Sequence, residues 1–210
     1  MTTGRPGRFI SLEGGEGVGK STQTRALAAA LRARGCEVVE TREPGGSPGA
    51  EAIRGLILDG AADRWEPRAE ALLFAASRSD HVDRTIRPAL ARGAWVVSDR
   101  FVDSSVAYQG ADGLGSEAVW TLHQIGSGGL LPDRTLLLSL PMETAVERET
   151  ARDAGAADRF GLRDFAFRTT VAQNFRQLAA ADPARWRTID AGGTAESVTA
   201  RLLQAVEDLL

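Results

Sequence analysis

The chain has 210 residues, of which 43% are hydrophobic and 25% are charged, and its formal net charge is −3. This length and composition fit one globular domain and exclude a disordered or fibrous chain. The acidic balance argues against a nucleic-acid-binding surface, which is usually basic. No run approaches the roughly 18 consecutive apolar residues of a membrane span, and the first residues lack the apolar core of a secretory signal. We therefore expect a cytoplasmic protein with no membrane and no nucleic-acid partner.

Short apolar runs alternate with helical patterns along the chain. The first half predicts strands at 8–13 and 37–41. It predicts helices at 22–34, 48–58 and 67–92, the last in two pieces around Pro88. The second half predicts strands at 95–99, 135–140 and 187–190, a helix that begins near Pro141 and an amphipathic helix at 196–210. This alternation predicts an α/β fold in one domain spanning 1–210, with a five-stranded parallel sheet covered by helices on both faces. Ligands of such folds bind at the carboxyl ends of the strands.

The cysteine and lysine residues are few. Cys36 is the single cysteine, so no internal disulfide can form, and we expect a half-buried thiol at a strand edge with no chemical role. Among the 25 Lys and Arg residues, only Lys20 is a lysine. A lone lysine inside a glycine-rich loop indicates a site that needs a compact ammonium group and cannot take a planar guanidinium.

That glycine-rich loop lies between the first predicted strand and the first predicted helix. From Gly14 to Ser21 it reads Gly-Gly-Glu-Gly-Val-Gly-Lys-Ser, the Gly-x4-Gly-Lys-Ser/Thr pattern of a P-loop. In this context backbone N–H groups and the helix N-terminus can surround phosphate oxygens. Lys20 would reach the β and γ phosphates, and the Ser21 hydroxyl would ligate Mg²⁺. The predicted nucleotide-binding residues are Gly14, Gly15, Glu16, Gly17, Val18, Gly19, Lys20, Ser21 and Thr22.

A carboxylate and a guanidinium follow one another at the end of a second strand. Asp99 ends the strand at 95–99 and Arg100 comes next, so both side chains leave the sheet at the edge that carries the P-loop. We expect Asp99 to be a metal ligand together with Ser21. The alternative for Asp99 is a helix N-cap or a surface ion pair.

Five motifs in order along the chain resemble those of the thymidylate kinase family. They are LEGGEGVGKST at 12–22, TREPGG at 41–46, IRGLIL at 53–58, LLFAASRSDH at 72–81 and SDRFVDSSVAYQG at 98–110. The resemblance implies the P-loop nucleoside monophosphate kinase fold with a short lid. It also implies transfer of the γ-phosphoryl group of ATP to dTMP, giving dTDP and ADP, with Mg²⁺ as cofactor and a homodimer as the assembly.

The resemblance further implies an acceptor site. Arg54 and Arg100 would hold the acceptor phosphate through paired hydrogen bonds. Phe74 would stack on the thymine ring, and Arg78 would bond the edge of the ring. The other implied residues are Ser104, Ser105 and Gln109 around the base, Tyr108 against the sugar, Glu16 at the 3′-hydroxyl, and Glu43 near Mg²⁺ and the acceptor phosphate.

The implied lid covers about residues 148–161. Its arginines would bring charge to the γ-phosphate, because phosphoryl transfer depends mainly on positioning and charge stabilisation. The implied catalytic residues are Lys20, Arg100, Arg148, Arg152 and Arg159. Gly161 stands where the family usually has an acidic residue, which leaves open which lid arginine acts.

Three alternatives remain at this point. The first is a related P-loop kinase that acts on another pyrimidine nucleoside monophosphate. The second is a weakened paralogue that binds nucleotides, which the altered lid allows. The third is a GTPase-like switch, since Asp112 to Gly115 matches a loose Asp-x-x-Gly pattern, but a chain with one lysine, at position 20, has no Asn-Lys-x-Asp motif to read guanine.

Overall fold

A computed structural model gives the structure of the chain and describes residues 6–61, 63–153 and 164–210. The described residues form one parallel sheet in the order β2-β3-β1-β4-β5. Its strands are β1 (Phe9–Glu13), β2 (Val38–Arg42), β3 (Trp95–Asp99), β4 (Arg134–Ser139) and β5 (Trp186–Asp190). The predicted five-stranded parallel sheet is therefore confirmed, with strand bounds that match or differ by one residue.

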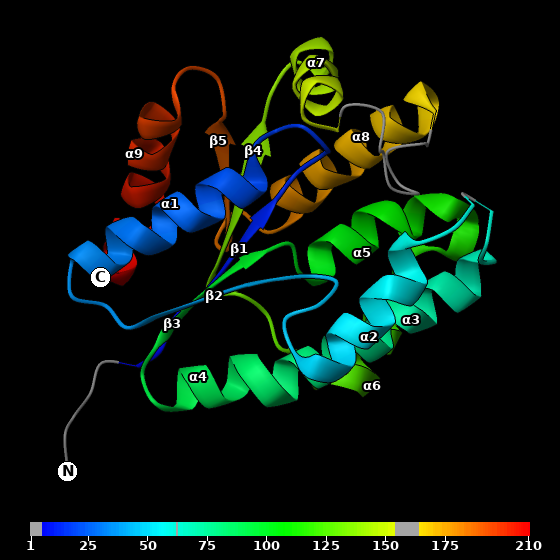
Figure 1. Cartoon of the computed structure of the whole chain (residues 1–210), viewed down its shortest axis with the longest axis horizontal. Coiled ribbons are helices and arrows are strands. Elements are labelled where there is room, and N and C mark those ends of the chain that lie inside the picture. The colour runs from blue at the N-terminus through cyan, green and yellow to red at the C-terminus, as the bar shows by residue number, and fades with distance from the viewer. Residues whose placement is uncertain (1–5, 62, 154–163) are drawn as a thin grey trace.

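Helices cover both faces of this sheet (Figure 1). On one face lie α1 (Lys20–Ala33) and α9 (Ala195–Ala205). The other face carries α4 (Arg87–Ala91), α5 (Val102–Tyr108), α6 (Ser116–Ser127) and α8 (Phe165–Ala181). Outside them lie α2 (Pro48–Leu58) and α3 (Pro67–His81), and α7 (Met142–Asp153) follows β4.

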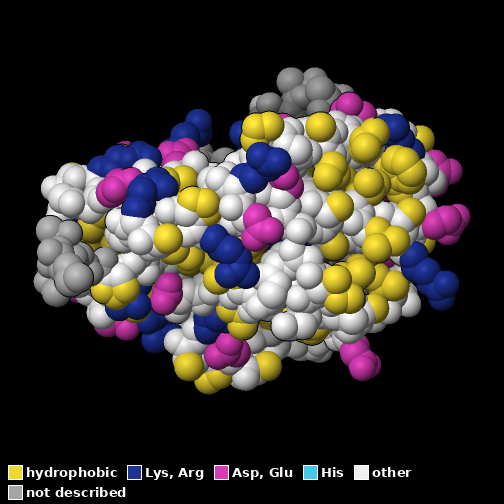
Figure 2. All heavy atoms as spheres, turned by 90° about the horizontal axis from the view of Figure 1, so that it is seen from below, with side chains coloured by type: hydrophobic (Ala, Val, Ile, Leu, Met, Phe, Trp, Pro, Cys, Tyr) yellow, Lys and Arg dark blue, Asp and Glu magenta, His cyan; other side chains and the backbone are white. Residues whose placement is uncertain are grey.

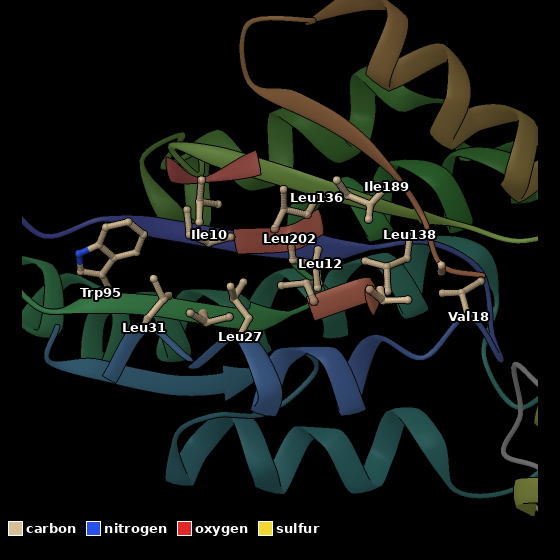
Figure 3. Packing of buried hydrophobic residues seen from close by; sticks show 14 of the residues in the cluster. Ile10, Leu12, Val18, Leu27, Leu31, Trp95, Leu136, Leu138, Ile189 and Leu202 are labelled. Atoms are coloured by element: carbon tan, nitrogen blue, oxygen red, sulfur yellow. The ribbon is translucent and has the colours of Figure 1, made fainter. Parts of the chain in front are cut away.

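The core is built from the alternation of side chains along the strands. Ile10 and Leu12 of β1 point to the α1 and α9 side, whereas Phe9 belongs to the cluster on the opposite face. Figure 3 shows Leu27 of α1 and Leu202 of α9 packed against the first set. Because both faces of β1 are buried, this strand is held rigidly at the centre of the sheet, and the loop that follows it has a fixed base.

The sequence patterns do not predict three of the helices. All seven residues of α5 are buried, including the polar Asp103, Ser104 and Ser105, so this helix has no exposed polar face to set an amphipathic period. The second of these helices is α6, for which the sequence analysis assigns no pattern. For α8 a signal does exist, because Phe167, Val171 and Phe175 recur at a spacing of four residues on its inner side.

The long helix expected at 67–92 is divided, as predicted, near Pro88. A π-helical turn (Val82–Ile86) follows α3, and Pro88 lies in the first turn of α4, where its missing N–H is tolerated. The last helix ends at Ala205, before a 3₁₀ turn (Glu207–Leu209). No helix within the described ranges is long and apolar enough to cross a membrane.

Candidate active site

A cavity of about 710 Å³ opens at the carboxyl ends of β1, β2 and β3, where the fold predicts a ligand. The P-loop, α2, α3, α5 and the segment after β5 contribute to its wall. Seventeen of the predicted site residues line it: Glu16, Gly17, Val18, Gly19, Lys20, Ser21, Thr22, Glu43, Arg54, Phe74, Asp99, Arg100, Ser104, Ser105, Tyr108, Gln109 and Arg148. Sequence reasoning missed other lining residues, among them Arg42, Pro44 and Leu58.

The P-loop runs from the end of β1 directly into α1. Gly17 has a φ of 73° and lies so close to α7 that a Cβ there would come within 1.9 Å of the Ala145 carbonyl oxygen. Gly19, also in the left-handed region, precedes the first residue of α1 and offers no side-chain cap. The N–H groups of the first turn of α1 are therefore left for a ligand, and an anion is favoured at this position.

Lys20 is buried in this loop. Its Nζ donates a hydrogen bond to the Gly15 carbonyl oxygen at 2.6 Å. Burial and the nearby Arg100 charge lower the pKa of Lys20 to about 8, although Glu16 and Asp99 oppose the shift. A polyphosphate placed in the loop would add negative charge beside the ammonium and favour its protonated form.

Ser21 and Asp99 meet where α1 begins and β3 ends. The Ser21 hydroxyl donates to Asp99 Oδ2 at 2.5 Å. A hydroxyl and a carboxylate oxygen are the hard ligands that Mg²⁺ takes, usually together with waters and phosphates rather than within a protein cage. The described part of the chain holds no cluster of three or more His, Cys, Asp or Glu residues that could bind a metal alone.

Arg100 links the P-loop to the far side of the cavity. Its backbone is in the left-handed region, with a φ of 71°. Nη1 donates to the Gly14 carbonyl oxygen at 3.1 Å and to the Ser104 hydroxyl at 2.9 Å, while Nη2 donates to Glu16 and to the Tyr108 hydroxyl. The guanidinium is thus held between the loop and α5.

Arg78 is buried beside the cavity and does not line it. Its Nε donates to Glu43 Oε2 at 2.8 Å, and its Nη2 donates to the Ser105 hydroxyl at 2.7 Å. Burial alone would raise the pKa of Glu43, but the Arg78 charge and a hydrogen bond from His81 outweigh it and hold this pKa below its usual value. Both partners of Arg78 line the cavity, as do the neighbouring Phe74 and Gln109.

Two further predicted arginines reach the cavity wall. Arg54 donates to the Pro44 carbonyl oxygen at 2.5 Å, and Arg148 of α7 donates to the Ala191 carbonyl oxygen at 3.3 Å. The side chain of Arg152 and the whole of Arg159 lie outside the described residues, as does most of the predicted lid.

Comparisons with known proteins agree with this geometry. The family model described as thymidylate kinase matches residues 12–202. A thymidylate kinase of Rhizorhabdus wittichii is 68% identical over 206 residues, which cover 98% of this chain and 99% of the relative. One from Caulobacter vibrioides is 50% identical, over 95% of this chain and 96% of the relative. A crystal structure of thymidylate kinase from Ehrlichia chaffeensis matches with a TM-score of 0.75 at 25% identity, over 96% and 99% of the two chains.

The chain belongs to the thymidylate kinase family. It is therefore a nucleoside monophosphate kinase, a phosphotransferase that uses ATP as phosphate donor. The resemblance and the P-loop nucleoside monophosphate kinase fold expected from it are confirmed. The comparisons do not favour a kinase for another pyrimidine nucleotide or a weakened paralogue.

Sequence reasoning also missed a buried residue that supports the site of this kinase. Glu13, the last residue of β1, is fully buried. Its Oε1 accepts the Phe101 N–H at 2.8 Å and its Oε2 accepts the Ser104 hydroxyl at 2.5 Å. Glu13 thereby holds the turn after β3 that carries Arg100. Burial, and next the Asp103 charge, raise the pKa of Glu13 to about 8.

The raised pKa of Glu13 leads to a stability test. Since the ordinary pKa of a glutamate side chain is 4.5 and that of Glu13 in the folded chain is about 8, the folded state keeps a proton that the unfolded state loses. The contribution of Glu13 to the free energy of unfolding is therefore fully present below about pH 4.5, and it falls as the pH rises toward 8. We expect Glu13→Gln, which imitates the protonated carboxyl, to lack this fall. Urea unfolding of both proteins at pH 5, 6, 7 and 8 measures the difference, and parallel curves would contradict the assignment.

Proposed function

We propose that this kinase transfers the γ-phosphoryl group of ATP to the 5′-phosphate of dTMP, giving dTDP and ADP. The observation that carries the proposal is the position of Glu16. This P-loop residue accepts hydrogen bonds from both Arg100 and the Tyr108 hydroxyl within one cavity. A donor nucleotide on the loop and an acceptor nucleotide against Arg100 would therefore lie next to each other.

The donor half of the proposed site is the P-loop, Gly14 to Thr22. Lys20 would contact the β and γ phosphates, in exchange for its bond to the Gly15 carbonyl oxygen. Arg148 lines the cavity, and Arg152 and Arg159 would complete the charge around the transferred group. We propose that the lid at about 148–161 is part of a single domain spanning 1–210.

The acceptor half of the proposed site faces the loop across the cavity. Arg100 would exchange its bond to the Glu16 carboxylate for the acceptor phosphate, and Arg54 would bind the same phosphate. The freed Glu16 would then accept the sugar 3′-hydroxyl. In the base pocket, Phe74 would stack on the thymine ring and Arg78 would bond its edge, with Glu43 behind Arg78. Ser104, Ser105 and Gln109 would surround the base, and Tyr108 would lie toward the sugar.

The residues at the P-loop fit a magnesium ion shared with the nucleotide. Ser21 and Asp99 supply two adjacent oxygen ligands, and Mg²⁺ usually takes its remaining ligands from waters and substrate phosphates. When bound, Mg²⁺ would neutralise phosphate charge during transfer.

We expect Asp99→Asn to raise the Mg²⁺ concentration required for half-maximal activity by about tenfold, because an amide oxygen is a weaker ligand than a carboxylate. Titration of MgCl₂ at fixed ATP measures this. The KM for dTMP at saturating Mg²⁺ is the control and should change little. An unchanged Mg²⁺ requirement would mean that Asp99 serves only as the partner of Ser21.

The acceptor is tested by ADP release from Mg-ATP with five nucleotides in parallel: dTMP, dUMP, dCMP, dGMP and UMP. We expect dTMP to give the highest kcat/KM. The thymine methyl group alone contributes about 1 to 3 kcal/mol in an apolar pocket, so dUMP should follow at roughly 10- to 200-fold lower kcat/KM. Equal rates with all acceptors, or none with any, would contradict the proposal.

We further propose a homodimer in the cytoplasm. Leu72 of α3 is 56% exposed and Ile125 of α6 is 79% exposed, and these two helices pack against each other. Figure 2 shows hydrophobic side chains gathered on the side of the molecule where α2, α3 and α6 lie in Figure 1. An exposed apolar surface of this kind is typical of an interaction site. Ile125→Asp should yield a monomer by sedimentation if this surface joins two copies.

A further inference from the structure

A buried chain of hydrogen bonds runs behind the acceptor pocket, from β2 to Arg78. The Thr41 hydroxyl lies 2.7 Å from His81 Nε2, and His81 Nδ1 lies 3.0 Å from Glu43 Oε1. The other carboxylate oxygen of Glu43 accepts from Arg78 at 2.8 Å. His81 is fully buried, and neither His81 nor Thr41 lines the cavity. Substrate would therefore not touch either residue.

The chemistry of the groups sets the direction of each bond. The carboxylate of Glu43 is held ionised by Arg78, which keeps its pKa low, so it only accepts, and the proton on His81 must be on Nδ1. An imidazole that carries its single proton on Nδ1 accepts the Thr41 hydroxyl at Nε2. Each carboxylate oxygen of Glu43 thus receives one donor, from His81 on one side and from Arg78 on the other.

This arrangement engages two of the three guanidinium nitrogens of Arg78. Nε is engaged by Glu43 and Nη2 by Ser105, while Nη1 has no hydrogen-bond partner among residues 6–61, 63–153 and 164–210. The guanidinium carbon also lies 5.5 Å from the centre of the Phe101 ring. Arg78 is therefore fixed on three sides, and its orientation depends on where Glu43 is held.

The surrounding backbone is built closely around His81. His81 is the last residue of α3, and the π-helical turn that follows carries Thr85, whose hydroxyl donates to the Gly46 carbonyl oxygen at 2.7 Å. A Cβ at Gly46 would come within 2.4 Å of the Thr41 hydroxyl oxygen and 2.5 Å of His81 Nε2. The loop at Gly46 therefore closes over the contact between Thr41 and His81. Single π-turns inside helices occur frequently at functional sites.

We propose that His81 is a positioning residue for recognition of the acceptor base, which holds Glu43, and through it Arg78, so that Nη1 faces the thymine edge. The inference rests on the proposed function, since it assumes that Arg78 reads the base. Thymine has a carbonyl oxygen at ring position 4, where cytosine has an amino group. A fixed donor at this position accepts dTMP and rejects dCMP.

The decisive experiment compares His81→Leu with His81→Asn. These two side chains have nearly the same shape, but only asparagine places an N–H close to the position of Nδ1. We expect His81→Leu to raise the KM for dTMP about tenfold or more, to leave the KM for ATP within about twofold, and to lower the ratio of kcat/KM for dTMP over dCMP about tenfold. His81→Asn should restore the KM for dTMP to within about threefold of the wild type.

Thr41→Val tests the far end of the chain without touching α3. It should raise the KM for dTMP in the same direction but by a smaller factor, because the bond between His81 and Glu43 remains. If thermal unfolding shows that His81→Leu does not fold, Thr41→Val and His81→Asn decide the question. Unchanged dTMP selectivity in Thr41→Val together with a large loss of selectivity in His81→Asn would overturn the proposal.

The chain offers a matched control in its other histidine. His123 is also buried, but its Nε2 bonds the Leu130 carbonyl oxygen, and neither residue lines the cavity. His123→Leu should lower the midpoint of thermal unfolding while the ratio of dTMP to dCMP stays within about twofold.

Three outcomes overturn the inference while leaving the proposed function intact. They are a wild-type KM for dTMP in folded His81→Leu, equal defects in the asparagine and leucine variants, or an equal loss of selectivity in His123→Leu. Failure of the wild-type protein to phosphorylate dTMP would instead reject the proposed function.

Discussion

Replacing Lys20 by methionine should lower kcat by about a thousandfold, with a smaller effect on the KM for dTMP. Methionine keeps the length of the side chain and removes the charge. Loss of one preorganised donor to developing charge in a closed site reduces rates by about 10² to 10³, and Lys20 is proposed to contact the β and γ phosphates. Steady-state kinetics with Mg-ATP and dTMP measures the effect. Lys20→Arg is the matched control for charge and should also be impaired, since a planar guanidinium is larger than an ammonium group and does not act as a compact point charge.

Amine modification gives a second measurement on the same residue. Lys20 is the only lysine, so a reagent selective for amines has one side-chain target. Because the pKa of Lys20 is lowered to about 8, labelling of the free enzyme should increase steeply between about pH 7 and 9. Mg-ATP should block it. Labelling that is insensitive to Mg-ATP, or a methionine variant with kcat within tenfold of the wild type, would contradict the assigned role.

Asp103→Ala should lower the free energy of unfolding by about 3 to 5 kcal/mol. Asp103 is fully buried at the start of α5, and its two oxygens accept from Arg185 at 2.5 and 3.0 Å. Arg185 also donates to the Thr135 hydroxyl at 2.7 Å. Removal of Asp103 takes away the buried partner of Arg185 and leaves it only the more exposed Asp182, and loss of a buried partner destabilises most. Urea unfolding at neutral pH measures the change.

Asp182 is the matched control for this experiment, because it pairs with the same arginine from the surface. Its Oδ2 accepts from Arg185 Nε at 3.0 Å, but its side chain is 43% exposed. Asp182→Ala should therefore reduce stability by less than about 1 kcal/mol. Equal effects of the two substitutions would show that burial does not govern this ion pair.

Local patterns were sufficient for the elements that carry their own signal. The P-loop is a contiguous motif, so the position of Lys20 and Ser21 could be predicted from spacing alone, and Asp99 could be placed because it ends an apolar strand. The structure brings Ser21 and Asp99 together, with the Ser21 hydroxyl oxygen 2.5 Å from Asp99 Oδ2. By contrast α5 buries its polar residues together with its apolar ones, so no amphipathic period could identify it.

The function of single side chains is harder to predict when their partners are distant in sequence. Glu13 has the pattern of an ordinary strand residue, because the Ser104 hydroxyl that it holds lies 91 positions away. Resemblance assigns Arg78 to the base edge, and only the structure shows that Glu43 and Ser105 occupy two of its three nitrogens. In the sequence His81 is only the end of a motif, and its place behind the pocket is set by its contacts with Thr41 and Glu43, which lie 40 and 38 positions away.

The sequence alone determined three features, because each depends on residues that are neighbours in the chain. They are the P-loop with its single lysine, the alternation of strands and helices, and the order of the five motifs. The tertiary structure decided which charges meet. Three of these contacts join segments 40 to 91 residues apart: Glu16 with Arg100, Glu13 with Ser104, and Thr41 with His81. Hydrogen bonds and buried charges act over a few ångströms, so their partners follow from the folded geometry and leave no local pattern in the sequence.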